Sequence, residues 1–149
     1  VAAGGLKVFI VRREQWDDAS AKVAQLAKEG DVMVQPYLRA FETEGERSYI
    51  FFNGVLSHAV RRPPTLTTAP RGFAEPHGFT PDNAEEQRLA HEVMEASGGA
   101  RLLYARVDVA TDNEGRTRLQ EVEVTEPCLF LPMDAGAAER MARAVVARL

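Results

Sequence analysis

Two stretches near the C-terminal end of the sequence alternate between apolar and charged side chains. They span residues 105–109 and 119–127. Because successive side chains of a strand point to opposite faces, the charged residues of each stretch share one face and the apolar residues share the other. Each stretch is therefore expected to form a strand with one charged face. The charged residues in question are Arg106, Asp108, Glu121 and Glu123.

Residues 111–116 lie between the two stretches and have the Asp, Asn and Gly content of a hairpin turn. A connection with an even number of residues pairs even-numbered positions with odd-numbered ones, which predicts that Asp108 and Glu121 share a face. A slip of one residue would bury the carboxylates and expose the valines, so the apolar pattern favours this register. We therefore expect three acids and one guanidinium on one exposed face of an antiparallel sheet.

Three carboxylates placed so close together repel one another unless a cation or an arginine compensates. Magnesium takes one or two carboxylates and completes its octahedron with water and phosphate oxygens, which suits this group. Asp108, Glu121 and Glu123 are therefore candidate metal ligands. The alternative is a solvated charged face of the kind that antiparallel sheets commonly present to water, and the pattern alone does not separate the two.

The composition is that of one folded domain with an ordinary core: 149 residues, 45% hydrophobic and 27% charged. A formal net charge of -4 argues against non-specific nucleic-acid binding. Cys128 is the single cysteine, which excludes an intramolecular disulfide and favours a reducing compartment. No apolar run approaches membrane-spanning length. We therefore expect a cytoplasmic protein without nucleic-acid or membrane partners.

Four more strands are expected before the two alternating stretches. Asn53-Gly54 is a strong hairpin signal between strands expected at residues 46–53 and 55–62. Residues 63–80 are rich in Pro, Thr and Gly, and they are expected to form a long loop that closes over a ligand as a lid. The remaining strands are expected at residues 6–11 and 31–35.

Three helices are predicted from apolar residues at helical spacing. The first covers residues 16–27, the second begins at Thr80-Pro81 and ends at Gly98-Gly99, and Asp134 caps the third. The inward face of the third helix is expected to hold Ala138, Met141, Val145 and Leu149. This order of elements predicts an α+β fold with a largely antiparallel sheet flanked by helices.

Four parts of the chain carry a resemblance to a known family. They are residues 2–8, residues 32–38, residues 44–48 with 57–63, and residues 106–108 with 121–127. In this order they resemble the phosphate-covering Gly-rich loop, the adenine-binding hinge strand, the hairpin that opens the catalytic lobe, and the metal-binding hairpin of the ATP-grasp superfamily. The resemblance is to the glutathione synthetase-like ligases, which include a D-cycloserine-forming cyclo-ligase, and it covers essentially the whole chain.

The resemblance implies the C-terminal portion of an ATP-grasp fold. Residues 1–35 would end the small nucleotide-covering subdomain, and residues 36–149 would form the catalytic, metal-binding lobe. The metal ligands for Mg²⁺ or Mn²⁺ would be Asp108, Glu121 and Glu123, although the family usually has Asn where this chain has Glu123. The residues that would bind ATP are Gly4, Gly5, Gln35, Pro36, Tyr37, Leu38 and Glu46. The residues that would act on the phosphate or the substrate are Arg61 and Arg106.

By the same resemblance, the function is ATP- and Mg²⁺-dependent formation of an amide-type bond between a small carboxylate substrate and an amine, through an acyl phosphate. The lysine and the substrate domain that the family carries before the Gly-rich loop would precede Val1. We therefore expect the chain alone to bind nucleotide weakly, to lack ligase activity, and to form a homodimer through the open strand edge at residues 6–11. Two alternatives stay open: a non-catalytic nucleotide- or metal-binding module, and an interaction domain with a solvated acidic face.

Overall fold

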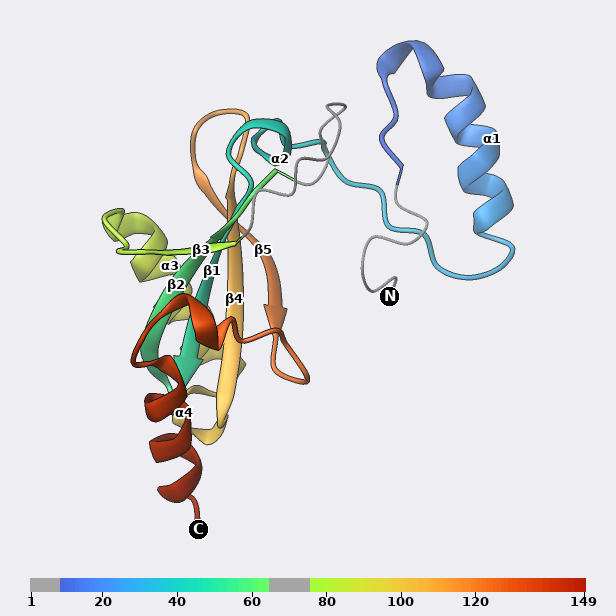
Figure 1. Cartoon of the computed structure of the whole chain (residues 1–149). Coiled ribbons are helices and arrows are strands. Elements are labelled where there is room, and N and C mark those ends of the chain that lie inside the picture. Colours follow the sequence, from blue (N-terminus) through green and yellow to red (C-terminus); the bar gives the residue numbers. More distant parts are fainter. Residues whose placement is uncertain (1–8, 65–75) are drawn as a thin grey trace. The chain divides into compact units, whose positions relative to one another are not determined.

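The computed structural model describes residues 9–64 and 76–149, and the chain divides into two compact units, Val1–Tyr37 and Leu38–Leu149. In the first unit, helix α1 spans Trp16–Leu26 and follows a 3₁₀ turn, η2, at Arg13–Gln15 (Figure 1). Ala19 is the buried residue of this helix. The helix expected from residue 16 is therefore confirmed.

The two strands expected in the first unit do not form in its described residues. Residues 9–11 and 31–35 are not in strands, and residues 6–8 lie outside the described part of the chain. Within residues 9–37 neither segment has a hydrogen-bonded strand beside it. A strand without a neighbour leaves its backbone N–H and C=O groups unpaired. These two predictions are wrong because apolar content indicates an extended segment and not the partner that it needs.

The second unit is built on one five-stranded sheet (Figure 1). Its strands are β1 (Glu46–Phe52), β2 (Val55–Arg62), β3 (His77–Phe79), β4 (Tyr104–Thr111) and β5 (Thr117–Glu123). They lie in the order β3-β2-β1-β4-β5, and every neighbouring pair is antiparallel. The predicted α+β class with an antiparallel sheet is confirmed. β3 falls inside the predicted long loop, which is wrong for these residues, and residues 65–75 of that loop lie outside the described chain.

The hairpin between β1 and β2 turns at Asn53 and Gly54, as predicted. Both residues have positive φ, 48° for Asn53 and 81° for Gly54. Two consecutive residues in this left-handed region are typical of the tight turn that matches the twist of the flanking strands. A side chain at Gly54 would also meet the backbone nitrogen of Ala100 at 2.9 Å, so glycine is required there twice over.

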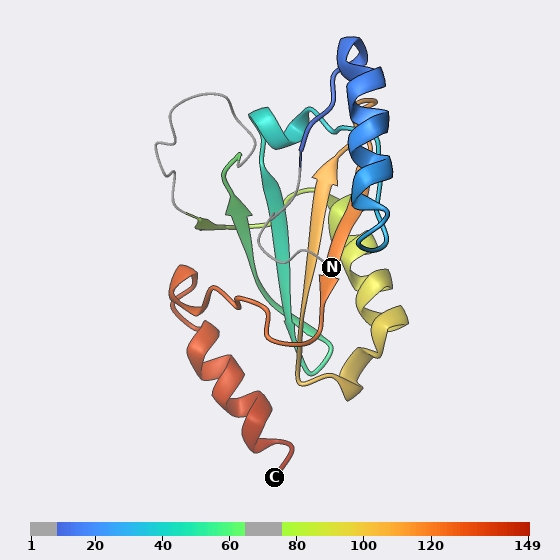
Figure 2. The same cartoon turned by 90° about the vertical axis from the view of Figure 1, so that its right-hand side faces the viewer.

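Each face of the sheet has its own apolar core. Tyr49, Phe51 and Val107 pack with Ala90 and Met94 of helix α3, which spans Ala84–Ser97. On the other face, a second core forms around Ile50, Phe52, Val60 and Ala144. Ala144 belongs to helix α4 (Ala137–Val146), so α3 and α4 cover opposite faces of the sheet (Figure 2).

Helix α3 begins three residues later than predicted. Its N-cap is Asn83, whose side-chain Oδ1 accepts hydrogen bonds from the backbone N–H groups of Glu85 at 3.0 Å and Glu86 at 3.2 Å. Thr80 is therefore not the cap, because the asparagine side chain satisfies the free N–H groups at the actual start of the helix. The predicted end is confirmed, since the helix stops at Gly98 with φ 142°.

Helix α4 uses a different face from the one predicted. Its buried residues are Ala137 and Ala144, with Met141 half-buried between them. Ala138, Val145 and Leu149 are exposed, so three of the four predicted inward residues are wrong. Alanine lets the helix approach the sheet closely, which places the larger residues one position away from the contact. The predicted cap is also wrong: the N-cap is Gly136, and Asp134, two residues before it, accepts a hydrogen bond from the N–H of Gly136 at 2.9 Å.

The charged face of β4 is buried and not exposed as expected. Asp108 is fully buried and Arg106 is 5% exposed. Val107, which points to the opposite face, is also buried, so both faces of β4 are covered. Residues 129–133, which include the 3₁₀ turn η4 (Leu131–Met133), pack on the same face of the sheet. Short elements α2 (Ala40–Thr43) and η3 (Gly99–Arg101) complete the unit. No helix among the described residues is long and apolar enough to cross a bilayer.

Candidate metal and phosphate site

A β-bulge in β5 creates the acidic face. Near the turn, Val109 pairs with Leu119, whereas on the far side of the bulge Asp108 pairs with Glu121 and Arg106 pairs with Glu123. Gln120 is the extra residue between the two registers. The shared face of Asp108 and Glu121 is therefore confirmed, although the mechanism that we expected for it is wrong.

The turn itself would give the opposite result. Thr111 pairs with Thr117, so five residues lie between them and the connection is odd-numbered. Continued without a bulge, that register would place Glu121 opposite Val107, on the apolar face that packs against α3. Bulges are often found beside functional sites, where they re-aim a side chain. Here the bulge moves two carboxylates from the apolar core to the face of Asp108.

Three carboxylates then converge. Asp108, Glu121 and Glu123 each offer an oxygen, and these oxygens all lie within 4.8 Å of one another. Their exposure increases from Asp108, which is fully buried, through Glu123, which is half-buried, to Glu121, which is exposed. The group is therefore anchored in the protein at one end and open to solvent at the other.

Arg106 holds two of the three carboxylates. Its Nε lies 3.0 Å from Oδ1 of Asp108, and its Nη2 lies 2.9 Å from Oδ2 of Asp108 and 2.5 Å from Oε1 of Glu123. Burial by itself lowers the pKa of Arg106, but the hydrogen bonds and charge of Asp108 outweigh it and raise that pKa above its ordinary value. The guanidinium of Arg106 is thus always charged and is held by hydrogen bonds to both Asp108 and Glu123.

Arg62 is the second guanidinium of the site, and it was not predicted. Its Nη2 lies 2.6 Å from Oδ2 of Asp108 and 3.2 Å from Oε2 of Glu46. Glu46 and Arg62 are opposite one another on β1 and β2. Gly45 lets this end of the hairpin close, since a Cβ there would lie 2.0 Å from the carbonyl oxygen of Arg62.

Arg61, the predicted residue, lies on the other face of the sheet. It is exposed, and its guanidinium carbon lies 5.9 Å from the centre of the Phe79 ring. The reason is a second bulge, at Ser57 in β2, where Phe51 pairs with Leu56 but Ile50 pairs with His58. Counting from the Asn53-Gly54 turn without that bulge would pair Glu46 with Arg61. Nothing in the local sequence signals the extra residue.

The charges of the site do not balance. Within residues 9–64 and 76–149, four carboxylates, Glu46, Asp108, Glu121 and Glu123, face two guanidinium groups, which gives these groups an excess of two negative charges when all are ionised. Among the described residues, Glu121 has no hydrogen bond or ion pair. Partial burial raises the pKa of Glu121, and repulsion from Glu123 and Asp108 raises it further. Burial likewise raises the pKa of Glu46, against the lowering effect of Arg62.

These properties fit a magnesium ion better than a purely structural cluster. Magnesium prefers carboxylate oxygens and keeps positions for water and phosphate. Glu121 lies at the open end of the group and has no hydrogen bond or ion pair with another described residue. A cation there would also relieve the repulsion that raises the pKa of Glu121. The donor set is thus chemically suited to Mg²⁺ or Mn²⁺.

The grouping of the other predicted nucleotide-binding residues stays a prediction. Gly4 and Gly5 lie outside the described residues. Gln35 and Pro36 are exposed and Tyr37 is half-buried in the first unit, whereas Leu38 begins the second unit. Glu46 reaches the acidic cluster through its ion pair with Arg62.

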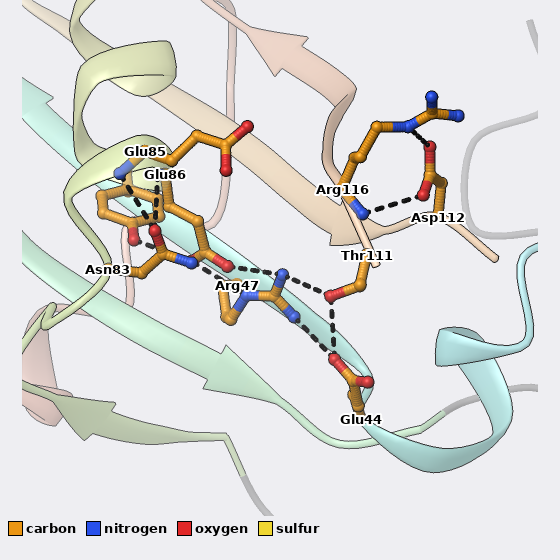
Figure 3. A network of polar contacts seen from close by, with 9 residues as sticks. Glu44, Arg47, Asn83, Glu85, Glu86, Thr111, Asp112 and Arg116 are labelled. Carbon is orange, nitrogen blue, oxygen red and sulfur yellow. Dashed lines mark hydrogen bonds and ion pairs between the residues drawn. The ribbon is translucent and has the colours of Figure 1, made fainter. Parts of the chain in front are cut away.

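A second polar network lies on the opposite face of the sheet (Figure 3), and it too was not predicted. Arg47 contacts both oxygens of Glu86, with Nη2 at 2.7 Å from Oε1 and Nε at 3.0 Å from Oε2. The hydroxyl of Tyr49 donates to Glu86 at 3.0 Å, and Arg47 donates to Thr111 at 3.0 Å and approaches Glu44 at 3.5 Å. Burial and the charge of Glu86 raise the pKa of Tyr49, so this network ties α3 to the sheet with a protonated tyrosine.

Comparison with known proteins identifies the fold. No family model matches the chain. The cycloserine biosynthesis protein DcsG of Streptomyces lavendulae is 31% identical over 147 residues, which cover 93% of this chain and 49% of DcsG. The chain thus spans about half the length of the curated relative that it matches.

Solved structures give the same result. The crystal structure of D-cycloserine synthetase DcsG matches with a TM-score of 0.75 and 28% identity, over 92% of this chain and 49% of that one. The D-alanine–D-alanine ligase of Bacillus anthracis, solved with ATP, matches with a TM-score of 0.53 and 16% identity, over 88% and 45%. The ATP-grasp ligase PsnB, solved with a minimal precursor, Mg and ADP, matches with a TM-score of 0.51 and 10% identity, over 70% and 33%. The resemblance drawn from the sequence is therefore confirmed: the chain has the ATP-grasp fold in the form seen in D-cycloserine synthetase.

Proposed function

We propose that this chain supplies the magnesium- and phosphate-binding part of an ATP-dependent carboxylate–amine ligase. One observation carries the proposal: three carboxylates with oxygens within 4.8 Å of one another face two arginines, on the sheet of an ATP-grasp fold. The similar proteins support it in general terms, because D-cycloserine synthetase, D-alanine–D-alanine ligase and PsnB are ligases or synthetases by name.

Asp108, Glu121 and Glu123 would hold Mg²⁺, or Mn²⁺ in its place. When bound, the ion supplies neutralisation of phosphate charge and fixes the orientation of the triphosphate. Glu123 replaces the Asn that the resemblance leads us to expect, and its carboxylate is an equally hard ligand that adds negative charge. The unpaired carboxylate of Glu121 is the ligand with the least to lose on binding a cation, since it has no competing partner among the described residues.

Arg106 and Arg62 would bind phosphate oxygens and stabilise the charge that develops during transfer. Both are pre-oriented by Asp108, so little side-chain freedom remains to be lost when a phosphate binds. Arg62 takes the role that the sequence pattern suggested for Arg61. By resemblance, Gln35 to Leu38 would seat adenine, and Gly4 and Gly5 would cover the phosphates.

The reaction that we propose has two steps. The terminal phosphoryl group of ATP passes to an oxygen of a small carboxylate substrate, which gives an acyl phosphate and ADP. The amine nitrogen then attacks the carbonyl carbon, the bond from that carbon to the phosphate oxygen breaks, and the nitrogen loses a proton. Such chemistry depends on positioning and charge neutralisation, which the two arginines and the carboxylates provide.

Calorimetric titration of the protein with a non-hydrolysable ATP analogue, with and without Mg²⁺, tests the proposal. We expect binding that requires Mg²⁺, and at least about tenfold weaker binding for Glu121→Ala. Glu114→Ala is the matched control, because Glu114 is an exposed acid in the turn of the same hairpin and outside the cluster. Equal affinity for both variants and the wild type would overturn the assignment. ADP release by the complete ligase of which this chain is proposed to be a part, with a carboxylate and an amine present, distinguishes a ligase from a non-catalytic nucleotide-binding module.

A further inference from the structure

A chain of hydrogen bonds leads from helix α4 to the segment that follows β5. Nε of Arg140 donates to Oγ of Ser57 at 2.8 Å, Oγ of Ser57 lies 3.0 Å from Nδ1 of His58, and Nε2 of His58 lies 3.0 Å from the carbonyl oxygen of Leu129. Because a carbonyl oxygen only accepts, Nε2 carries the proton of the ring. Nδ1 of the neutral ring then accepts from the hydroxyl of Ser57. Each group has one defined role, so the imidazole has one tautomer.

The surroundings of His58 favour this neutral form. The residue is 7% exposed, and burial lowers its pKa below the ordinary value. Asp134 and Arg140 are the charged groups that act on it, with opposite effects, and the carbonyl of Leu129 partly opposes the effect of burial. The ring also packs against Phe52, with ring centres 6.2 Å apart.

The bulge in β2 puts His58 on this face. His58 lies opposite Ile50 only because Ser57 is the extra residue of the strand. Without the bulge, Ser57 would lie opposite Ile50 and His58 would point to the α3 side. The bulge residue is itself held by both Arg140 and His58 through its hydroxyl.

The carbonyl that His58 binds lies between two contacts to Arg106. The carbonyl oxygen of Cys128 accepts from Nη1 of Arg106 at 3.3 Å, and the ring of Phe130 lies 5.8 Å from the guanidinium carbon of Arg106. Phe130 has φ 49°, in the left-handed region that is unfavourable for a bulky residue. Residues 128–130 therefore need an external anchor to keep this shape, and the bond from His58 to Leu129 provides one.

We propose that His58 is a positioning residue that fixes Arg106 between Asp108 and Glu123 by anchoring residues 128–130. His58 touches neither the carboxylates nor Arg106, so its effect passes through the backbone of Leu129. The functional meaning rests on the proposed role of Arg106 in phosphate binding, whereas the positioning itself does not.

The exchange of arginine Nε–H protons with water, measured by NMR, tests the positioning directly. Nε of Arg106 bonds to Asp108, and Nε of Arg47 bonds to Glu86 on the other face of the sheet. Arg47 is therefore an internal reference in the same spectrum. In His58→Leu we expect exchange at Arg106 to accelerate about tenfold, as for the loss of one buried hydrogen bond, and exchange at Arg47 to stay unchanged.

His91→Leu is the matched control. His58 packs against Phe52 of β1, and His91 packs edge-on against the neighbouring Phe51 of β1, with ring centres 5.2 Å apart. The contact of His91 lies on the other face of the sheet, which α3 covers. The control variant should leave Arg106 exchange as in the wild type. His58→Gln, whose amide can still donate to the Leu129 carbonyl, should restore most of the protection.

Two results would overturn the proposal: no acceleration at Arg106 in His58→Leu, or equal acceleration at Arg106 and Arg47, which would indicate general loosening of the sheet. Titration of the same variants with Mg²⁺ and the ATP analogue separates this inference from the proposed function. If the wild type binds no nucleotide, the function fails while the exchange result still decides the role of His58.

Discussion

The two faces of the sheet carry two polar clusters that differ in how completely their buried carboxylates are hydrogen-bonded. On the α3 face, Arg47 contacts both oxygens of Glu86 and one oxygen of Glu44. Tyr49 donates a second hydrogen bond to Glu86, and Thr111 donates one to Glu44. On the face that α4 covers, the described residues bring four carboxylates together with two arginines. Both oxygens of the buried Glu86 have hydrogen-bond partners, whereas Glu121 has none among the residues that the structure describes.

This difference in pairing suggests different roles for the two clusters, one in stabilising the fold and one in binding a ligand. A buried pair with complete hydrogen bonding is stable without help from a ligand, although it contributes little net stability over an apolar core. Glu121 has no hydrogen bond or ion pair within the described part of the chain, and burial raises its pKa, so its ionised form is disfavoured in the free protein. Such a cost is expected at a site where a cation or a charged substrate later binds.

The largest effect that we expect comes from breaking the satisfied cluster. Arg47→Leu would leave Glu86 buried and without its counter-charge, so the free energy of unfolding should fall by about 3–5 kcal/mol. Urea denaturation followed by circular dichroism measures it. Arg88→Leu, which removes an exposed pair with Glu92 on the same helix, should cost less than about 1 kcal/mol. Similar losses for the two variants would mean that the Arg47 network is not a structural tie.

The second effect concerns the two neighbouring arginines of β2. Arg62→Ala should weaken binding of the Mg²⁺–ATP analogue about tenfold or more, because a charge-assisted contact to phosphate is lost. Arg61→Ala should stay within about twofold of the wild type, since Arg61 points to the other face. Calorimetry on both variants gives the answer. The reverse order of effects would show that β2 lacks the bulge at Ser57 in solution.

A smaller effect is expected on stability from the unsatisfied cluster itself. The raised pKa of Glu121 means that the folded state disfavours its ionised form, so stability is lost as the pH rises through that pKa. Glu121→Gln should remove this loss and leave the free protein as stable at pH 7, or more stable by up to about 1 kcal/mol, because solvent screens an exposed carboxylate. Thermal unfolding at pH 4 and pH 7 compares the two proteins. A clear loss of stability at pH 7 would mean that Glu121 has a structural partner.

The smallest effect comes from His58. Its pKa is lowered by burial, so the unfolded chain takes up a proton more readily than the folded protein. The stability due to His58 is therefore complete above the ordinary value of 6.5 and is lost as the pH falls from there towards the folded-state pKa. Unfolding curves between pH 7.5 and pH 5 should show a steeper decline for the wild type than for His58→Gln; parallel curves would contradict the assignment.

Local patterns predicted the parts of the site that depend on one strand or one turn. The alternation in β4 and the Asn53-Gly54 hairpin both follow from neighbouring residues, and both are confirmed. Register was not predictable in the same way. Arg140, which lies 83 positions away in the sequence, donates a hydrogen bond to the bulge residue Ser57. The bulge places Arg62 at the site instead of Arg61, so this choice depends on a tertiary contact that the local sequence does not show.

Burial was missed for a related reason. The alternation in β4 indicates two chemically different faces, but not that residues 129–133 pack over the charged one. The strands expected at residues 6–11 and 31–35 are wrong for the described residues 9–11 and 31–35, because a partner strand cannot be read from one segment. The resemblance, which combined several weak local signals in order, predicted the fold better than any single element did.

The two bulges also decide how relatives of this chain should be aligned. Pairing β5 with β4 without the bulge at Gln120 would change no charged residue. Glu121 and Glu123 would then point towards the apolar core that packs against α3. A one-residue gap placed within β2 equates Arg61 with Arg62, although the two side chains lie on opposite sides of the sheet. In these two hairpins, a register shift of one residue therefore changes which side chains face the carboxylate cluster. The position of a gap in an alignment is then as informative about function as the residue types are.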